Sequence, residues 1–143
     1  MPGSSTSCVD ASLVVPFISA ASPEYVVGLW SSWRAERTSL VAPYLLRYEV
    51  VNAIRRALAT GRVDVPTARL GIQSLLALPI KFTDTASMHD RALFLASQFN
   101  LPTTYNAHYL ALAEEFDCEF WTADKRLARA TAGAFPLLHL VEH

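Results

Sequence analysis

Short apolar runs alternate along the chain with longer segments whose apolar residues recur at helical spacing. The short runs predict five β-strands, at residues 7–10, 39–42, 80–82, 119–122 and 137–141. The longer segments predict six helices, at residues 23–37, 45–59, 64–77, 87–99, 103–115 and 124–132. Alternating strands and helices favour a parallel sheet with helices on both faces, which is an α/β fold.

Turn and capping signals agree with these boundaries. Thr60-Gly61 ends the helix that starts at Leu45, because glycine accepts the left-handed conformation common after a helix. Asp64 is placed to cap the next helix, with Pro66 in its first turn. Near the N-terminus, Ser12 is expected to cap a helical turn that contains Pro16.

Length and composition are those of one compact domain. The chain has 143 residues, of which 52% are hydrophobic and 17% charged, so we expect a single domain over 1–143 with residues 1–6 flexible. The first residues lack the basic start of a secretory signal, and the uncharged stretch 11–23 is too short and proline-broken to span a bilayer. We therefore expect a cytoplasmic protein without a membrane partner.

Cysteine and arginine usage narrow the chemistry. Cys8 and Cys118 lack zinc-site spacing, so both are interpreted as buried thiols. The span 47–69 holds five arginines and two acids, a net charge of +3. Arginine suits bidentate phosphate contacts, but a solvated helix face with ordinary ion pairs explains the same span equally well.

Three acids are predicted to meet at one edge of the sheet. Asp10 and Asp124 each follow a predicted strand, and Glu49 lies in the first turns of a helix after another strand. Ligands of parallel sheets gather at the carboxyl ends of the strands. Carboxylates without histidine or thiolate suit Mg²⁺ or Mn²⁺, which can promote phosphodiester hydrolysis. Singly, each acid is explained as well by helix capping or an ion pair, such as Glu49 with Arg56.

Four short blocks make the chain resemble the PIN-domain family of metal-dependent ribonucleases, which includes the VapC-type toxins. The blocks are VDAS (9–12), EVVNA (49–53), YNAHYLALA (105–113) and TADKRL (122–127). The third and fourth blocks are the most diagnostic. The resemblance covers nearly the whole chain, from Cys8 to Val141.

The resemblance implies a three-layer α/β/α fold with a parallel sheet of about five strands. It also implies Mg²⁺ or Mn²⁺ as cofactor, single-stranded RNA as substrate, a homodimer, and an antitoxin protein as partner. The implied catalytic residues are Asp10, Glu49, Asn106 and Asp124, with Asp10, Asp124 and Glu49 as metal ligands. The implied supporting residues are Thr122 and Asn52, although Thr122 as a helix cap and Asn52 as an exposed helix residue remain alternatives.

Asn106 departs from the family, whose members usually have aspartate there. An amide oxygen can bind a hard cation, but it carries no charge and cannot act as a base. A weakened enzyme, a binding protein derived from an enzyme, and an engineered replacement of aspartate all account for the amide. We therefore expect a toxin-type endoribonuclease attenuated or inactivated at this position, with a catalytically silent domain that binds RNA or an antitoxin-like protein as the alternative.

The basic residues Arg55, Arg56, Lys125 and Arg126 are candidates for steering RNA into the acidic site. Other assignments are weaker. A phospho-acceptor receiver domain needs a lysine at a later strand end, and Lys81 is poorly placed for it. The five glycines never form the GxGxxG pattern of a dinucleotide site. Trp30 and Trp33 are expected to pack on the sheet rather than form a partner surface, and His89 and His108 to be surface or capping residues.

Overall fold

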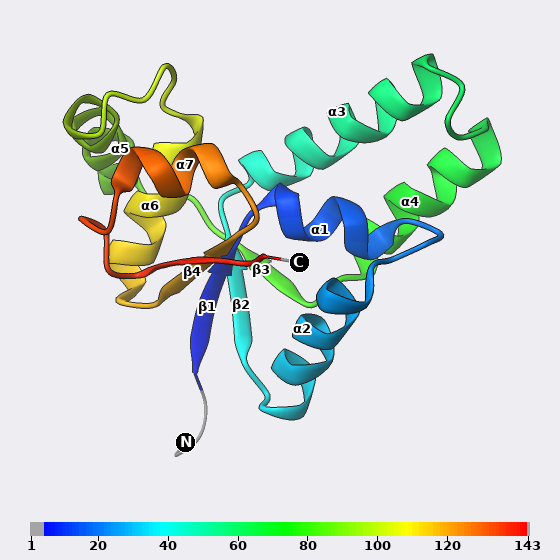
Figure 1. Ribbon diagram of the computed structural model, residues 1–143, viewed down its shortest axis with the longest axis horizontal. Helices are drawn as coiled ribbons and strands as arrows, with labels where there is room; N and C mark the ends of the chain where they lie inside the picture. Colours follow the sequence, from blue (N-terminus) through cyan, green and yellow to red (C-terminus); the bar gives the residue numbers. More distant parts are fainter. Residues whose placement is uncertain (1–4, 143) are drawn as a thin grey trace.

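The computed structural model describes residues 5–142 and has a five-stranded, all-parallel sheet (Figure 1). The strands are β1 (Thr6–Val9), β2 (Ser39–Ala42), β3 (Ile80–Phe82), β4 (Glu119–Thr122) and β5 (Leu138–Leu140). Their order across the sheet is β3-β2-β1-β4-β5. The predicted α/β fold with five parallel strands is confirmed.

Seven helices connect and cover the strands in the described part of the chain. They are α1 (Ala11–Ile18), α2 (Glu24–Ala35), α3 (Leu45–Ala59), α4 (Val65–Ala77), α5 (Ala86–Gln98), α6 (Tyr105–Phe116) and α7 (Lys125–Thr131). In Figure 1, α5 and α6 lie on one side of the sheet and α1 and α2 on the other, while α3 and α4 form a hairpin that extends away from it. The layers are therefore helix, sheet and helix, as the resemblance implied.

The order of the strands places two carboxyl ends side by side. β1 is the central strand and pairs with β2 on one edge and β4 on the other. The chain first builds outward through β2 and β3, and then crosses to β4 on the opposite side of β1. This reversal is the position at which parallel sheets form their binding crevices. The residues after β1 and β4 are therefore neighbours.

Aromatic packing fixes helices against the sheet. The rings of Tyr109 on α6 and Phe120 on β4 stack with centroids 5.7 Å apart, and both residues are fully enclosed. On the other side, Trp30 and Trp33 are buried, and the Trp30 indole N–H donates to the Leu13 carbonyl at 3.1 Å. Packing of both tryptophans in the core is thus confirmed.

Two details near the N-terminus differ from the sequence-based expectations. The residue that caps α1 is Asp10, whose carboxylate accepts from the Ser12 N–H, so the assignment of Ser12 as the cap is wrong. Asp10 has the extended backbone of an N-cap, and the helix continues through Pro16 to Ile18. In addition, β1 begins at Thr6, inside the segment 1–6 that was expected to be flexible; residues 1–4 lie outside the described part.

Cys8 and Cys118 are buried free thiols, in agreement with the interpretation of the sequence. Both thiol pKa values are raised because burial disfavours the thiolate, to about 11 for Cys118. Neither cysteine is activated for chemistry by its surroundings. Within residues 5–142, no helix combines the length and apolar character needed to cross a membrane.

Candidate functional site

The hydroxyl of Thr122 links the two acids at the neighbouring ends of β1 and β4. Thr122 is fully buried and donates a hydrogen bond to Asp10 Oδ2 at 2.6 Å. The hydroxyl oxygen of Thr122 also accepts a hydrogen bond from the Asp124 backbone N–H at 3.0 Å. Register pairs Val9 with Trp121, so this bridge follows directly from the alignment of the two strands. The threonine thus holds both acidic residues in a fixed relation.

Ser12 completes the connection between the two strand ends. Its hydroxyl donates to Asp10 Oδ1 at 2.5 Å and accepts from the Ala123 N–H at 2.8 Å. Ser12 and Thr122 hydroxyls lie 3.4 Å apart. Each oxygen of the Asp10 carboxylate therefore has at least one donor.

Asp124 performs a structural role in addition to its place at the site. Its Oδ1 accepts from the N–H groups of Arg126 at 2.9 Å and Leu127 at 3.1 Å, which caps α7. Capping satisfies N–H groups that have no partner inside the helix. Both cap bonds end on Oδ1, so the capping role expected for Asp124 as an alternative is compatible with a contact through Oδ2.

The environment of Asp10 disfavours a negative charge. The side chain is buried, and desolvation raises the pKa of Asp10 from 3.8 to about 6. The hydrogen bonds from Ser12 and Thr122 oppose this rise, while the nearby charge of Glu49 adds to it. The two carboxylates therefore interact, although they come from different elements of the fold.

Glu49 enters the site from α3 and is held by Tyr109 of α6. The phenol donates to Glu49 Oε1 at 2.5 Å. Partial burial raises the pKa of Glu49, and the hydrogen bond from Tyr109 partly offsets the rise. The pKa of Tyr109 is raised in turn, first by burial and then by the adjacent carboxylates. This phenol stays protonated and acts as a donor.

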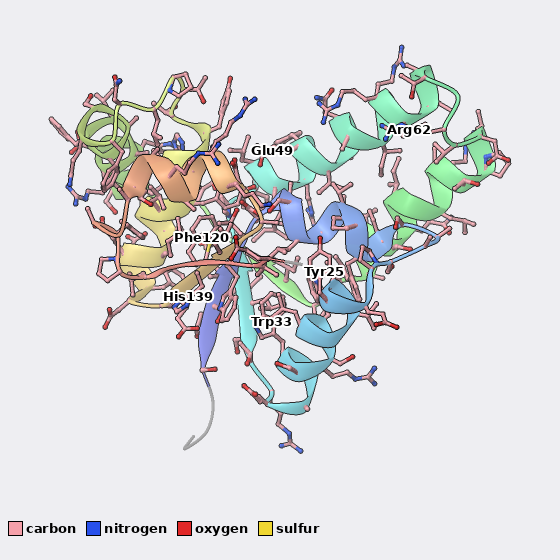
Figure 2. All side chains as sticks on the ribbon, in the orientation of Figure 1. Tyr25, Trp33, Glu49, Arg62, Phe120 and His139 are labelled. Carbon is pink, nitrogen blue, oxygen red and sulfur yellow. The ribbon has the colours of Figure 1, made fainter. Side chains whose placement is uncertain are left out.

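A cavity of about 420 Å³ opens between α1 and α3 beside these acids. Figure 2 shows Glu49 on the part of α3 nearest the sheet, with Arg62 beyond its far end. The polar side chains that line the cavity are Ser12, Glu49, Asn52 and Arg56. Asn52 thus shares a cavity with Glu49, one helical turn away. An arginine at the rim supplies the positive charge in an otherwise acidic hollow.

The remaining residues implied by the sequence do not line this cavity. Arg55, Lys125 and Arg126 are exposed, and their side chains are free to move in solvent. Asn106 is half-buried in the first turn of α6, three residues before Tyr109 and so on a neighbouring face of that helix. Within residues 5–142, the Asn106 amide makes no hydrogen bond.

Comparison with known proteins agrees with this geometry. No protein-family model matches the chain. The chain is 34% identical over 90 residues to ribonuclease VapC1 of Mycobacterium tuberculosis, covering 62% of this chain and 65% of that protein. It is 27% identical over 103 residues to ribonuclease VapC9 of the same species, covering 72% of this chain and 77% of that protein.

A solved structure extends the agreement over most of the fold. PAE2754 from Pyrobaculum aerophilum superposes with a TM-score of 0.66 at 25% identity, covering 91% of this chain and 89% of that one. The resemblance to the VapC-type PIN-domain family is confirmed. The first two PIN-like blocks contribute to the lining of the cavity. The third block supplies Tyr109, which holds Glu49, and the fourth supplies Thr122 and Asp124.

Two residues of the PIN-like blocks support the acids in a way that was not predicted: Ser12, which was expected only as a helix cap, and Tyr109. Ser12 ties Asp10 to the chain after β4, and Tyr109 holds Glu49. A signal for Tyr109 was present, because it is one turn from Asn106 on the helix of the third block. The signal for Ser12 was its place two residues after Asp10, a position whose N–H commonly donates to a capping carboxylate.

The donor set of the PIN-like site fits a hard divalent cation in its chemistry. The side chains available are three carboxylates and one amide, all oxygen ligands of the kind that Mg²⁺ and Mn²⁺ prefer. The pKa values of Asp10 and Glu49 are raised because their hydrogen bonds do not fully offset the loss of hydration on burial. In the described residues, however, no three His, Cys, Asp or Glu side chains are grouped closely enough to hold a metal ion. Asp10, Glu49 and Asp124 would therefore have to approach one another to hold a cation together.

Proposed function

We propose that the chain is a Mg²⁺- or Mn²⁺-dependent endoribonuclease, the toxin of a toxin–antitoxin pair, whose activity is attenuated by Asn106 in place of aspartate. The observation that carries this proposal is the Thr122 bridge between Asp10 and Asp124, which directs two acids to one edge of the sheet. Glu49 supplies a third acid from α3, on the lining of the cavity. Relatives named as ribonucleases support the reaction class.

In this proposal the acids divide the work by position. Asp10 and Asp124 would hold the cation at the ends of β1 and β4, and Glu49 would bind it from α3 or orient the attacking water. A bound Mg²⁺ or Mn²⁺ supplies positive charge to the phosphodiester and acidity to the water. Tyr109 would keep Glu49 in place by its hydrogen bond, and Ser12 and Thr122 would keep Asp10 in place.

RNA binding is assigned to the basic residues beside the cavity. Arg56 lines the cavity with Asn52, and Arg55 is exposed on the same helix. Lys125 and Arg126 are exposed in the first turn of α7, directly after Asp124. Positive charge at these positions would attract the RNA backbone to a site that is itself acidic. An antitoxin protein as partner, a homodimer and a cytoplasmic location complete the proposal.

Asn106 is the residue that limits activity in this proposal. Replacing a carboxylate by an amide removes one negative charge, and a net loss of about 1.4 kcal/mol weakens metal affinity about tenfold. Asn106→Asp should therefore increase metal-dependent RNA cleavage. The matched control is Gln73→Glu, which adds the same charge at an exposed position of α4 away from the cavity.

The test is a cleavage assay with Mn²⁺ on a mixture of unstructured RNAs. We expect Asn106→Asp to cut, the unchanged chain to cut far less, and Asp10→Ala in the Asn106→Asp background to be inactive. If Asn106→Asp and the unchanged chain are equally inactive at saturating Mn²⁺, the nuclease proposal is wrong.

A second function is favoured by the absence of a ready-made cluster of three acids in the described residues. In that case the chain would be a catalytically silent PIN-like domain that binds RNA or an antitoxin-like protein. RNA binding without cleavage, even after Asn106→Asp, would identify this function.

A further inference from the structure

A second hollow lies at the carboxyl ends of β2 and β3, and three exposed tyrosines surround it. Its volume is about 400 Å³, and its lining includes Tyr44, Tyr48 and Tyr105 together with His89 and His108. We call it the tyrosine pocket. The tyrosines are 44%, 73% and 57% exposed. Rings this exposed contribute little to the core, so their faces are available to a ligand.

The tyrosine pocket is continuous with the acidic site through two helices. Tyr48 directly precedes Glu49 on α3, and Tyr105 directly precedes Asn106 on α6. Successive residues of a helix point about 100° apart, and α3 presents Glu49 to the first cavity and Tyr48 to the tyrosine pocket. A chain molecule with its backbone at the acids would therefore place an adjoining group in the pocket.

Two hydrogen bonds fix the polar side of the pocket. His108 Nδ1 lies 2.7 Å from the Thr104 carbonyl, which can only accept, so this nitrogen carries a proton. In neutral His108, Nε2 is then an acceptor for His89 Nδ1 at 3.0 Å. This arrangement leaves Nε2 of His89 as an acceptor at the pocket wall.

The aromatic side of the pocket is also held in place. The Tyr44 N–H donates to Asp84 Oδ1 at 3.2 Å, and the Tyr44 ring lies 5.9 Å from that of Phe82. The Arg47 guanidinium lies 4.2 Å from the centre of the Phe82 ring. Its buried Nε has no hydrogen-bond partner within the described residues. The pocket wall thus carries one carboxylate, that of Asp84, and a positive charge lies one ring behind it.

We propose that the tyrosine pocket binds an unpaired base of single-stranded RNA, next to the phosphodiester held at the acidic site. The inference rests on the proposed ribonuclease function and adds a position that selects or orients the substrate. Aromatic rings stack on any base, and hydrogen-bonding groups beside them can distinguish one base from another. The volume falls in the range of about 300–1,000 Å³ that is common for small-ligand sites.

The experiment measures RNA binding without cleavage. A ten-nucleotide single-stranded RNA with a central 2-aminopurine is titrated with the full chain in EDTA, and the quenching of its fluorescence is followed. Tyr48→Leu and Tyr105→Leu should each weaken binding by about 5- to 100-fold and reduce the quenching. Tyr48→Phe and Tyr105→Phe retain the ring and should bind within about twofold of the unchanged chain.

The control is Phe94→Leu, because Phe94 is a 58% exposed aromatic residue of α5 outside the pocket lining. Thermal melting of every variant verifies folding, and light scattering measures its oligomeric state. The inference is overturned if the unchanged chain does not bind the RNA, or if the two tyrosine-to-leucine variants bind it as tightly as the unchanged chain does. It is equally overturned if Phe94→Leu loses as much RNA affinity as those variants. It is also overturned if the leucine variants change the oligomeric state, because the pocket would then join two copies of the chain.

This outcome is separable from that of the proposed function. Cleavage by Asn106→Asp that is indifferent to Tyr48→Leu and Tyr105→Leu would refute the pocket and leave the nuclease intact. Tyrosine-dependent binding without cleavage in any variant would refute the nuclease and leave the pocket as an RNA-binding surface.

Discussion

The candidate site has two halves that are built differently. The strand half consists of Asp10 and Asp124 at the ends of β1 and β4, joined by the buried hydroxyl of Thr122. The helix half consists of Glu49 on α3 and Asn106 on α6, both only half-buried. Among the described contacts, one hydrogen bond from Tyr109 holds Glu49, and none holds the Asn106 amide.

The difference follows from how each half is positioned. Parallel pairing fixes the strand ends to one register, and a shift by one residue would turn each side chain to the opposite face of the sheet. Helices attach through packing, and a side chain on a half-exposed face keeps rotamer freedom. The strand half is therefore preorganised by the fold, whereas the helix half depends on a ligand to bring it into position. Substitutions should consequently cost stability in the strand half and binding in the helix half.

The largest effect on stability is expected for Thr122→Val. The valine leaves Asp10 Oδ2 and the Asp124 N–H without their common partner in a buried place. Each unsatisfied group costs about 1–3 kcal/mol, so the free energy of unfolding should fall by about 3–4 kcal/mol at neutral pH. Urea denaturation measures it. Tyr109→Phe removes a single hydrogen bond, the one to Glu49 in the helix half, and should lower the free energy of unfolding by about 1 kcal/mol. An equal loss of stability in Thr122→Val and Tyr109→Phe would contradict the distinction between the two halves.

The next effect is a pH dependence that belongs to Asp10. Because burial raises its pKa from 3.8 to about 6, the native state still holds a proton between pH 4 and 6 that the unfolded state has lost. The contribution of Asp10 to the free energy of unfolding therefore falls as the pH rises through this window, by about 3 kcal/mol, and is constant below and above it.

Asp10→Asn isolates this contribution because the amide does not titrate. Urea denaturation of the unchanged chain and of Asp10→Asn at several pH values from 4 to 7.5 gives the difference between them. As the pH rises to about 6, the free energy of unfolding of Asp10→Asn should increase relative to that of the unchanged chain. A difference that does not vary with pH would show that the Asp10 carboxylate is not desolvated in the folded protein.

The smallest effect is expected from the basic rim of the helix half. Arg56→Gln removes one positive charge from the cavity wall without altering a described hydrogen bond to its side chain. If Arg56 contacts an RNA phosphate, the slope of log affinity against log salt should become shallower by about 0.7. Fluorescence titration of RNA at several salt concentrations measures the slope, with Arg62→Gln beyond the end of α3 as control. An unchanged slope would place the RNA backbone elsewhere.

Much of the fold could be predicted because it depends on local signals. The strands 39–42, 80–82 and 119–122 and the helix 45–59 match the structure, since apolar runs and Thr60-Gly61 mark them clearly. The helix α1 was less visible, because Pro16 interrupts its pattern and Ser12 resembles a cap. The N-cap of α1 is Asp10, which is also a candidate site residue. One side chain therefore both starts the helix and belongs to the candidate site.

The site was predictable only in part, for a related reason. Asp10 and Asp124 lie close together because β1 and β4 are neighbours in the sheet. The alternation of strands and helices in the sequence already indicates that both residues follow strands. The contacts of Ser12 with Ala123 and of Tyr109 with Glu49 join residues about 110 and 60 positions apart. No periodicity in one sequence specifies such pairs, because they depend on how the helices pack on the sheet.

The central claim is that these acids form one cation site that Asn106 weakens, and Mn²⁺ binding measured by calorimetry at pH 7.5 tests it most directly. We expect Asn106→Asp to bind Mn²⁺ about tenfold or more tightly than the unchanged chain, and Asp10→Asn in the Asn106→Asp background to lose that gain. Equal, weak binding by the unchanged chain and Asn106→Asp would contradict the account, because position 106 would then lie outside the cation site.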